Sequence, residues 1–232
     1  MGTEKNKVYR FERKFFISNL RGSEVKSIVK FHPYMFSEIF HKRHVNNIYF
    51  DTMNFDNYSD NVEGSSNRVK FRIRWYGDMF GFIEKPVLEL KIKNSMLGRK
   101  ESYKLKSFTL DKIFDSSVIE KVFIDSDLPE PIKYRLKFLM PSLLNRYVRE
   151  YFMSTDKKFR ITIDSEQVFV GIGKNFNCFL NRFNDNENTI LELKYDQDHD
   201  SKANLVTNQF PFRLTKSSKY VNGVSKINFD IY

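Results

Sequence analysis

The sequence predicts a mainly β protein with peripheral helices, because charged side chains recur on one face of its strands while apolar side chains occupy the other. Residues 68–76 show this most clearly. Read with a period of two, as a strand requires, they alternate cations with apolar side chains. The cations are Arg68, Lys70, Arg72 and Arg74, and the apolar residues are Val69, Phe71, Ile73 and Trp75. Like charges side by side repel one another, so an anion held against this row explains it better than solvent alone.

The same alternation recurs on later segments, which we interpret as strands of one antiparallel set. The predicted strands cover residues 8–17, 45–50, 68–77, 87–93, 100–106, 145–152, 158–164 and 189–195, with a less regular hairpin over 168–180. In a β-sandwich such polar faces are exposed to solvent and need no ligand. In a closed antiparallel barrel with a polar interior, they would line a lumen beneath apolar faces packed against helices. We favour the closed barrel and expect the bound anion to be a chain of phosphates.

Three stretches predict helices. Ser23 caps a short helix that stops before Pro33, and residues 198–210 form another. Between two sets of strands, a helical insertion covers about residues 109–144, where apolar side chains recur at helical spacing. We expect residues 1–232 to form a single domain that contains this insertion, with Trp75 packed in the core rather than stacked on a base.

The composition indicates which classes of partner the protein could bind and in which cellular compartment we expect it. Lys and Arg number 39 against 29 Asp and Glu, a formal net charge of +10, which suits a polyanion such as nucleic acid, a membrane surface or a phosphorylated small molecule. Cys178 is the only cysteine, which excludes a disulfide framework and a cysteine-based zinc cluster. No run approaches the roughly 20 apolar residues of a membrane-spanning helix, and no signal peptide is present. We therefore expect a soluble cytoplasmic protein.

A set of short motifs links the sequence to a known family. They are Glu12 with Lys14 on the first strand, IYFDT at 48–52, RIRWYG at 72–77, LELK at 88–91, Arg149 before an aromatic pair, RITID at 160–164, LELK at 191–194 and KSSKY at 216–220. Each motif alone is weak, but in this order they are specific, and they span the chain from about Phe11 to about Gly223. On these motifs the chain resembles the polyphosphate-polymerase domain of the vacuolar transporter chaperone (VTC) family. That family lies within the triphosphate tunnel metalloenzyme superfamily, which also includes the CYTH proteins.

The resemblance implies an antiparallel eight-stranded tunnel whose basic interior binds a nucleoside triphosphate and a divalent metal, Mn²⁺ or Mg²⁺. The implied phosphate ligands are Arg72, Arg74, Lys91, Lys104, Arg149 and Arg160. Lys14 matches the family's first-strand lysine, and the substrate contacts near the tunnel mouth are Lys216, Ser218, Lys219 and Tyr220. A hard cation favours carboxylate oxygen as a ligand. Glu192 is the implied metal ligand, and Glu89 and Glu12 are weaker candidates.

The implied activity is that of an ATP-polyphosphate phosphotransferase. It transfers the γ-phosphate of ATP to orthophosphate or to a growing polyphosphate chain and releases ADP. Arg10 stands where the CYTH branch has the first glutamate of its Glu-x-Glu-x-Lys signature, which favours the VTC branch over a CYTH triphosphatase or cyclase. The SPX domain and membrane helices of fungal VTC proteins are absent from this sequence, so we do not expect inositol-phosphate regulation or coupled translocation. A separate membrane partner, the acceptor and the oligomeric state stay open.

Two other functions compete with the polymerase. A tunnel triphosphatase acting on inorganic triphosphate or a nucleotide would differ only in using water as the acceptor. A non-catalytic module for polyphosphate or nucleic acid would use aromatic and basic residues as a stacking groove, but the embedded glutamates would repel a phosphate backbone unless a metal intervened. We therefore expect no nucleic-acid partner. Glu89 and Glu192 could also be plain ion-pair partners of nearby lysines, and residues 216–219 a simple basic helix start.

Overall fold

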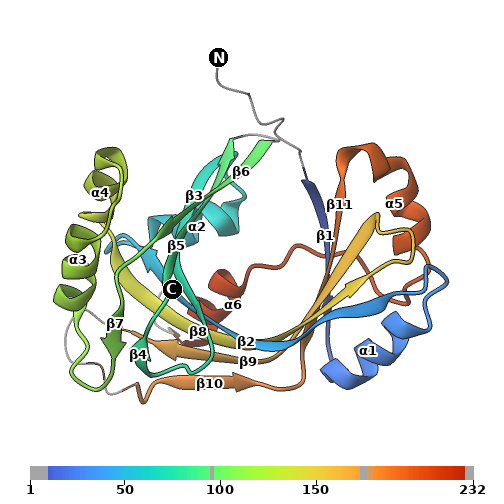
Figure 1. Cartoon of the computed structure of the whole chain (residues 1–232), viewed down its shortest axis with the longest axis horizontal. Coiled ribbons are helices and arrows are strands. Elements are labelled where there is room, and N and C mark those ends of the chain that lie inside the picture. Colours follow the sequence, from blue (N-terminus) through green and yellow to red (C-terminus); the bar gives the residue numbers. More distant parts are fainter. Residues whose placement is uncertain (1–9, 95–96, 173–176, 178, 228–232) are drawn as a thin grey trace. The chain divides into compact units, whose positions relative to one another are not determined.

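The computed structural model describes residues 10–94, 97–172, 177 and 179–227 (Figure 1). Its strands are β1 (Arg10–Ile17), β2 (Ser37–Asp51), β3 (Asn67–Tyr76), β4 (Gly81–Ile83), β5 (Val87–Asn94), β6 (Leu97–Lys104), β7 (Phe108–Leu110), β8 (Met140–Met153), β9 (Phe159–Gly171), β10 (Arg182–Asp185) and β11 (Thr189–Asp196). Its α-helices are α1 (Gly22–Lys30), α2 (Asp56–Glu63), α3 (Ser116–Asp125), α4 (Glu130–Leu136), α5 (Asp200–Thr207) and α6 (Lys219–Ile227), and a 3₁₀ turn spans Gln197–His199. Cys178 lies outside the described residues.

The strands confirm a mainly β, antiparallel architecture but not a closed barrel. One nine-stranded sheet has the order β1-β11-β9-β8-β2-β3-β5-β6, with β10 paired to β9, and β4 and β7 form a separate pair. Among the described residues this path is open at β1 and β6, so the predicted closed ring of eight strands is not found. At β1, Thr215 forms hydrogen bonds with the free edge. The Thr215 amide donates to the Lys14 carbonyl at 2.8 Å, and the Phe16 amide donates to Thr215 Oγ1 at 2.7 Å.

The chain divides into two compact units. The first comprises the described residues of Met1–Arg43, Val148–Gln167 and Asp185–Ser217, and the second those of His44–Tyr147, Val168–Asn184 and Ser218–Tyr232. Strands β2, β8 and β9 contribute residues to both units. The single domain expected for residues 1–232 stays a prediction.

In the first unit, the apolar faces of β1, β9 and β11 are covered by α1 and α5. Figure 1 shows α5 alongside β11. Phe15, Ile161 and Leu193 are fully buried there and pack with Val29 of α1 and Val206 of α5. The polar faces of the same strands consequently point away from this apolar core.

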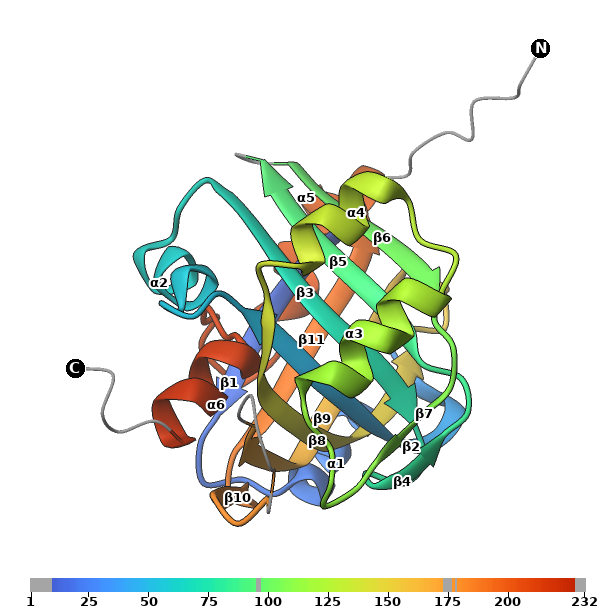
Figure 2. The same cartoon turned by 90° about the vertical axis from the view of Figure 1, so that its left-hand side faces the viewer.

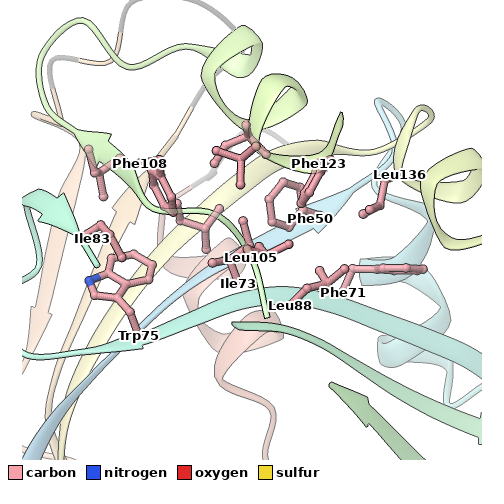
Figure 3. Packing of buried hydrophobic residues seen from close by; sticks show 14 of the residues in the cluster. Phe50, Phe71, Ile73, Trp75, Ile83, Leu88, Leu105, Phe108, Phe123 and Leu136 are labelled. Carbon is pink, nitrogen blue, oxygen red and sulfur yellow. The ribbon is translucent and has the colours of Figure 1, made fainter. Parts of the chain in front are cut away.

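In the second unit, α3 and α4 lie across the apolar face of β3 and β5 (Figure 2). Phe71, Ile73 and Trp75 of β3 all point into this core, where Figure 3 shows them among side chains from β2, β5 and the helices. Trp75 is 2% exposed and meets Phe108 edge-to-face, which confirms that it packs in the core. The cations of β3 therefore share the opposite face, as the alternation predicts.

Several boundaries differ from the predicted ones. Strand β2 begins at Ser37 rather than near residue 45, because its first half carries exposed polar residues that hide the strand period. Strand β4 lies between the predicted strands 68–77 and 87–93, and β9 continues to Gly171 into the predicted hairpin over residues 168–180. The insertion at about 109–144 holds α3 and α4, but Met140 already begins β8. None of the helices in the described ranges has the length and apolarity needed to cross a bilayer.

Candidate functional site

The polar face of β3, β5 and β6 in the second unit is strongly cationic. The antiparallel register sets Lys70 opposite Lys91 and Lys91 opposite Lys100, so three lysines form a row across three strands. The face carries four cations from β3, two from β5 and two from β6; they are Arg68, Lys70, Arg72, Arg74, Lys91, Lys93, Lys100 and Lys104. Glu89 is the one carboxylate on its described part. Like charges directly opposite one another are destabilising, so this face is suited to an anion with several charges.

Glu89 contacts three of the cations on that face. Its Oε2 lies 2.7 Å from Arg72 Nη2 and 3.3 Å from Arg74 Nη1, and Lys100 Nζ contacts its Oε1. Burial alone would raise the pKa of this carboxyl, but Arg72, Arg74 and Lys100 outweigh burial and lower the pKa to about 2. Both carboxylate oxygens are therefore engaged by cations, and Glu89 holds the two arginines in place.

Arg74 has a second set of partners on β2 and β8. Its Nε donates to Asn47 Oδ1 at 3.0 Å, and its Nη2 donates to the Tyr147 hydroxyl at 3.3 Å. Asn47 is fully buried, and its amide approaches Asn145 Oδ1 at 3.5 Å. Lys219 Nζ lies 4.5 Å from the centroid of the Tyr147 ring. Two predicted phosphate ligands, Arg74 and Lys219, thus share one buried tyrosine.

The start of α6 is fixed by side chains of the same unit. Ser218 Oγ accepts from Lys70 Nζ at 2.9 Å and from the Val221 amide at 3.4 Å. The Tyr220 hydroxyl donates to Asp51 Oδ2, while Asp51 also accepts from first-turn amides of α2. Tyr220 is 2% exposed, and burial together with Asp51 raises the pKa of its hydroxyl. Its hydroxyl therefore serves to anchor α6.

Close packing holds the rest of α6 against β8 and β9. A Cβ at Gly223 would meet the Leu143 and Phe169 side chains closer than van der Waals contact allows. Glycine is required here so that the helix backbone can approach the strands. This approach positions the α6 residues that carry the predicted substrate contacts.

Four predicted cations are solvent-exposed in the structure. Lys91 and Lys104 lie on the cationic face, where Lys104 is opposite Val87 at the end of β6. In the first unit, Arg160 is opposite Lys194 near the start of β9, and Lys216 lies in the segment before α6. The exposure of these side chains leaves room for a ligand.

The polar face of the first unit carries charges of both signs. Glu12 stands opposite Lys194, and Lys14 stands opposite Glu192. Lys14 Nζ lies 3.4 Å from Glu12 Oε1 and 3.6 Å from Glu192 Oε1, and it also reaches the Ser217 carbonyl at 3.5 Å. Burial alone would raise the pKa of Glu192, but Lys194 and Lys14 outweigh it and hold the pKa well below its ordinary value.

Arg149 joins this cluster through Asp164. Its Nε and Nη2 donate to the two carboxylate oxygens of Asp164 at 2.6 and 2.7 Å, and Nη2 lies 4.0 Å from Glu192 Oε2. The paired, parallel contact fixes the plane of the guanidinium. Thr162, opposite Glu192 on β9, has a buried hydroxyl without a hydrogen-bond partner among the described residues.

A divalent cation fits this mixed cluster better than the cationic face. Glu12 and Glu192 flank Lys14, so two carboxylates lie close together here, whereas the described part of the cationic face carries Glu89 alone. Lys14 and Lys194 also pair with Glu192, at 3.6 and 3.1 Å. No group of three or more His, Cys, Asp or Glu suited to a metal occurs among the described residues. Mg²⁺ commonly takes one or two carboxylates and completes its shell with water and substrate phosphates. Glu12 and Glu192 would supply that share.

The structure thus brings some predicted residues into direct contact and adds others. Arg72, Arg74 and Glu89 meet on the cationic face, and Glu12, Lys14 and Glu192 meet in the mixed cluster; these contacts lie within one unit each. The residues that sequence reasoning missed are Asn47, Tyr49, Asn145, Tyr147 and Asp164. The alternation of residues 145–152 puts Asn145, Tyr147 and Arg149 on one face, which was the available signal for two of them.

Comparison with known proteins identifies the family. The model of the VTC domain matches residues 9–228. The chain belongs to the VTC domain family. No curated protein sequence matches this VTC-domain chain.

The solved structures similar to this VTC-domain chain show its fold. A putative adenylyl cyclase from Hippeastrum, described as having a dominant triphosphatase activity, aligns with a TM-score of 0.50 at 14% identity and covers 95% of this chain and 99% of its own. The PH1819 protein from Pyrococcus horikoshii OT3 aligns with a TM-score of 0.50 at 13% identity, covering 94% and 99%. At these levels of identity the likeness shows that the VTC-domain chain shares the fold of these structures.

Proposed function

We propose that this VTC-domain chain is a metal-dependent polyphosphate polymerase. It transfers the γ-phosphate of ATP to orthophosphate or to the end of a growing polyphosphate chain, and ADP leaves. The observation that carries the proposal is the cationic face of β3, β5 and β6, where basic residues from three strands face the single carboxylate of Glu89 in the described residues. A ligand with several adjacent phosphates matches such a row of charges, whereas a single phosphate would neutralise only part of it.

The roles of the side chains follow the motifs shared with the family, whose model covers residues 9–228. Arg72 and Arg74, each oriented by Glu89, bind and position phosphate oxygens through their planar guanidinium groups. Lys91, Lys104, Lys216 and Ser218 supply further contacts along the phosphate chain. Arg149, Arg160 and Lys219 stabilise the charge that spreads over the equatorial oxygens of the transferred phosphoryl group.

The acidic residues of the first unit complete the assignment. Glu192 and Glu12 would hold Mn²⁺ or Mg²⁺, which would offset part of the negative charge on the triphosphate. Lys14 lies between both carboxylates and, together with Lys194, holds the pKa of Glu192 well below its ordinary value. No side-chain nucleophile is required, because the acceptor phosphate itself attacks.

A tunnel triphosphatase is the second candidate, and the activity of the Hippeastrum protein favours it. Its charges would bind the same triphosphate, and water would replace the phosphate acceptor. A non-catalytic polyphosphate-binding module is the third. The paired carboxylates of Glu12 and Glu192 argue against it, because carboxylates weaken the binding of a bare polyanion.

The decisive test incubates purified protein with ATP and Mn²⁺ and separates the products on a gel that resolves polyphosphate by length. We expect an acid-labile polymer together with ADP. Stoichiometric orthophosphate without polymer would support the triphosphatase instead. Tight polyphosphate binding with no turnover would support the binding module. An Arg74→Gln variant is expected to abolish polymer formation, whereas Arg182→Gln, an exposed arginine whose Nε donates to Asn184, serves as the matched control.

A further inference from the structure

We propose that Tyr147 is a positioning residue that makes Arg74 and Lys219 bind phosphate as a coupled pair. The inference rests on the proposed function and adds a residue to it. Tyr147 lies on β8 and is 1% exposed. Its hydroxyl accepts a hydrogen bond from Arg74 Nη2 at 3.3 Å, while Lys219 Nζ lies 4.5 Å from the centroid of its ring. One side chain thus contacts a cation from β3 and a cation from α6, all within the second unit.

Three acceptors orient the Arg74 guanidinium. Asn47 Oδ1 accepts from Nε at 3.0 Å, Glu89 Oε2 lies 3.3 Å from Nη1, and the Tyr147 hydroxyl accepts from Nη2. Glu89 is shared with Arg72 and Lys100, so it is not dedicated to Arg74. Asn47 and Tyr147 therefore set the plane in which Arg74 presents its remaining N–H groups.

The ring of Tyr147 acts on Lys219 in a different way. Lys219 is the first residue of α6, and the backbone there is anchored by Tyr220 on Asp51 and by Ser218 on Lys70. The lysine side chain is long and flexible, so an anchored backbone does not by itself place its ammonium group. A cation over the face of an aromatic ring is attracted by the ring's quadrupole, and this attraction strengthens when water is excluded. The buried ring is what holds the Lys219 ammonium at that place.

The tyrosine couples the two cations because its hydroxyl contacts Arg74 and its ring contacts Lys219. Its hydroxyl oxygen and its ring face each offer negative charge density, which offsets part of the repulsion between Arg74 and Lys219. A leucine in its place would leave that repulsion unchanged. A carboxylate in its place would neutralise the cations and compete with phosphate. When a phosphate chain binds, both cations are already oriented, and the ordering cost is not met separately for each. Loss of Tyr147 should therefore make each cation act independently.

The test uses the full-length chain and inorganic tripolyphosphate with EDTA, so that binding is measured without metal or turnover. Tyr147→Phe keeps the ring for Lys219 but removes the acceptor for Arg74, and we expect about a 5-fold weaker Kd. Tyr147→Leu removes both contacts, and we expect about a 50-fold weaker Kd. Tyr195→Phe is the matched control. Tyr195 is a buried tyrosine whose hydroxyl accepts from Arg13, with the Arg13 guanidinium 5.6 Å from its ring, and we expect no change in Kd.

A double-mutant cycle separates positioning from general stability. In the wild-type background, Arg74→Gln, Lys219→Gln and the double variant should each weaken the binding of tripolyphosphate. The fold-change in Kd of the double variant should differ by at least about 3-fold from the product of the two single fold-changes. In the Tyr147→Phe background this departure should shrink, and in Tyr147→Leu it should vanish. A merely structural role would lower the melting temperature while leaving the departure unchanged, and that result would overturn the inference.

The inference and the proposed function fail in different ways. Wild-type protein that does not bind tripolyphosphate would overturn both. Wild-type binding that both Tyr147 variants retain would overturn the inference alone. If Tyr147→Leu does not fold, Tyr147→Phe and its cycle still decide the question, because that variant keeps the volume and burial of the ring.

Discussion

The Arg149 guanidinium donates to both carboxylate oxygens of Asp164, at 2.6 and 2.7 Å, and Asp164 is 1% exposed. Asp164→Asn keeps the shape but removes the charge that holds Arg149. Breaking a buried ion pair leaves an uncompensated charge, so we expect the free energy of unfolding to fall by about 3 kcal/mol. We also expect kcat/KM for ATP to fall about 10- to 100-fold because Arg149 loses its fixed orientation. Denaturant unfolding and steady-state kinetics measure the two effects.

Asp200→Asn is the control for that experiment. Asp200 also pairs with an arginine of the first unit, Arg13, at 3.3 Å, but it is more than half exposed. Its loss should change stability by less than about 1 kcal/mol and leave kcat/KM unaltered. Equal activity losses in the two variants would contradict a specific role for Asp164.

Glu192→Gln distinguishes a metal ligand from an ion-pair partner. Removing this carboxylate from among Lys14, Lys194 and Arg149 leaves the cluster more positive. Binding of tripolyphosphate without metal should therefore stay equal or tighten, while metal-dependent turnover should fall at least about 100-fold. Titration in EDTA and turnover across a Mn²⁺ series provide the two readouts.

For that variant, Glu38→Gln is the matched control because Glu38 pairs with Lys26 at 3.2 Å elsewhere in the same unit. It should leave both readouts near wild type. Unchanged metal-dependent turnover in Glu192→Gln would show that Glu192 is an ion-pair partner only.

Glu89 predicts a pH dependence of stability. Its pKa is about 2 in the folded chain against an ordinary value of 4.5, since Arg72, Arg74 and Lys100 outweigh burial. A carboxyl whose pKa is lowered on folding contributes its full stabilisation above about pH 4.5, and loses it as the pH falls toward 2. The advantage of wild type over Glu89→Gln should therefore shrink by about 3 kcal/mol between pH 6 and pH 2.

Urea unfolding at a series of pH values measures that difference. Glu130→Gln, at an exposed ion pair with Lys133, should track wild type throughout. A difference in the free energy of unfolding between wild type and Glu89→Gln that does not depend on pH would contradict the claim that ionised Glu89 is stabilised by the cations around it.

Tyr220→Phe tests whether this residue anchors α6 or contacts substrate. The change removes the buried donor to Asp51, so we expect the free energy of unfolding to fall by about 2 kcal/mol. Because the hydroxyl is occupied by Asp51, the Kd for tripolyphosphate should change less than about 3-fold. Tyr134→Phe, at an exposed tyrosine of α4, is the control and should leave both unchanged. A large loss of affinity without loss of stability would restore Tyr220 as a direct substrate contact.

The sequence was sufficient to predict which side chains share a face of a strand, but not which side chains of other strands they contact. Alternation alone placed Arg72 and Arg74 on one face and Trp75 on the other, since side-chain direction in a strand has a period of two. The register of β3 against β5, which sets Arg72 opposite Glu89, depends on pairing between segments and is not written in either one. Tyr147 and Asp164 were missed for the same reason, because their importance lies in the partner that another strand brings.

Two further features could not be predicted from the local sequence pattern. The closed ring was expected because recurring polar faces suit a lumen, but alternation says nothing about whether the last edges pair, and at β1 the Thr215 segment takes that place. Residues 216–219 were interpreted either as substrate contacts or as a simple basic helix start, and α6 does begin at Lys219. The packing of Gly223 against Leu143, which places the helix backbone close to the strands, depends on a tertiary contact that the local pattern does not contain.

The most direct test of the central claim is the fate of the phosphoryl group. Purified protein is incubated with ATP and Mn²⁺, quenched with excess EDTA, and assayed for ADP, orthophosphate and polymer-bound phosphate in the same sample. If the chain is a polyphosphate polymerase, each ADP released is matched by one phosphate in polymer, and orthophosphate does not accumulate. One orthophosphate per ADP, with no polymer at any time point, would contradict it.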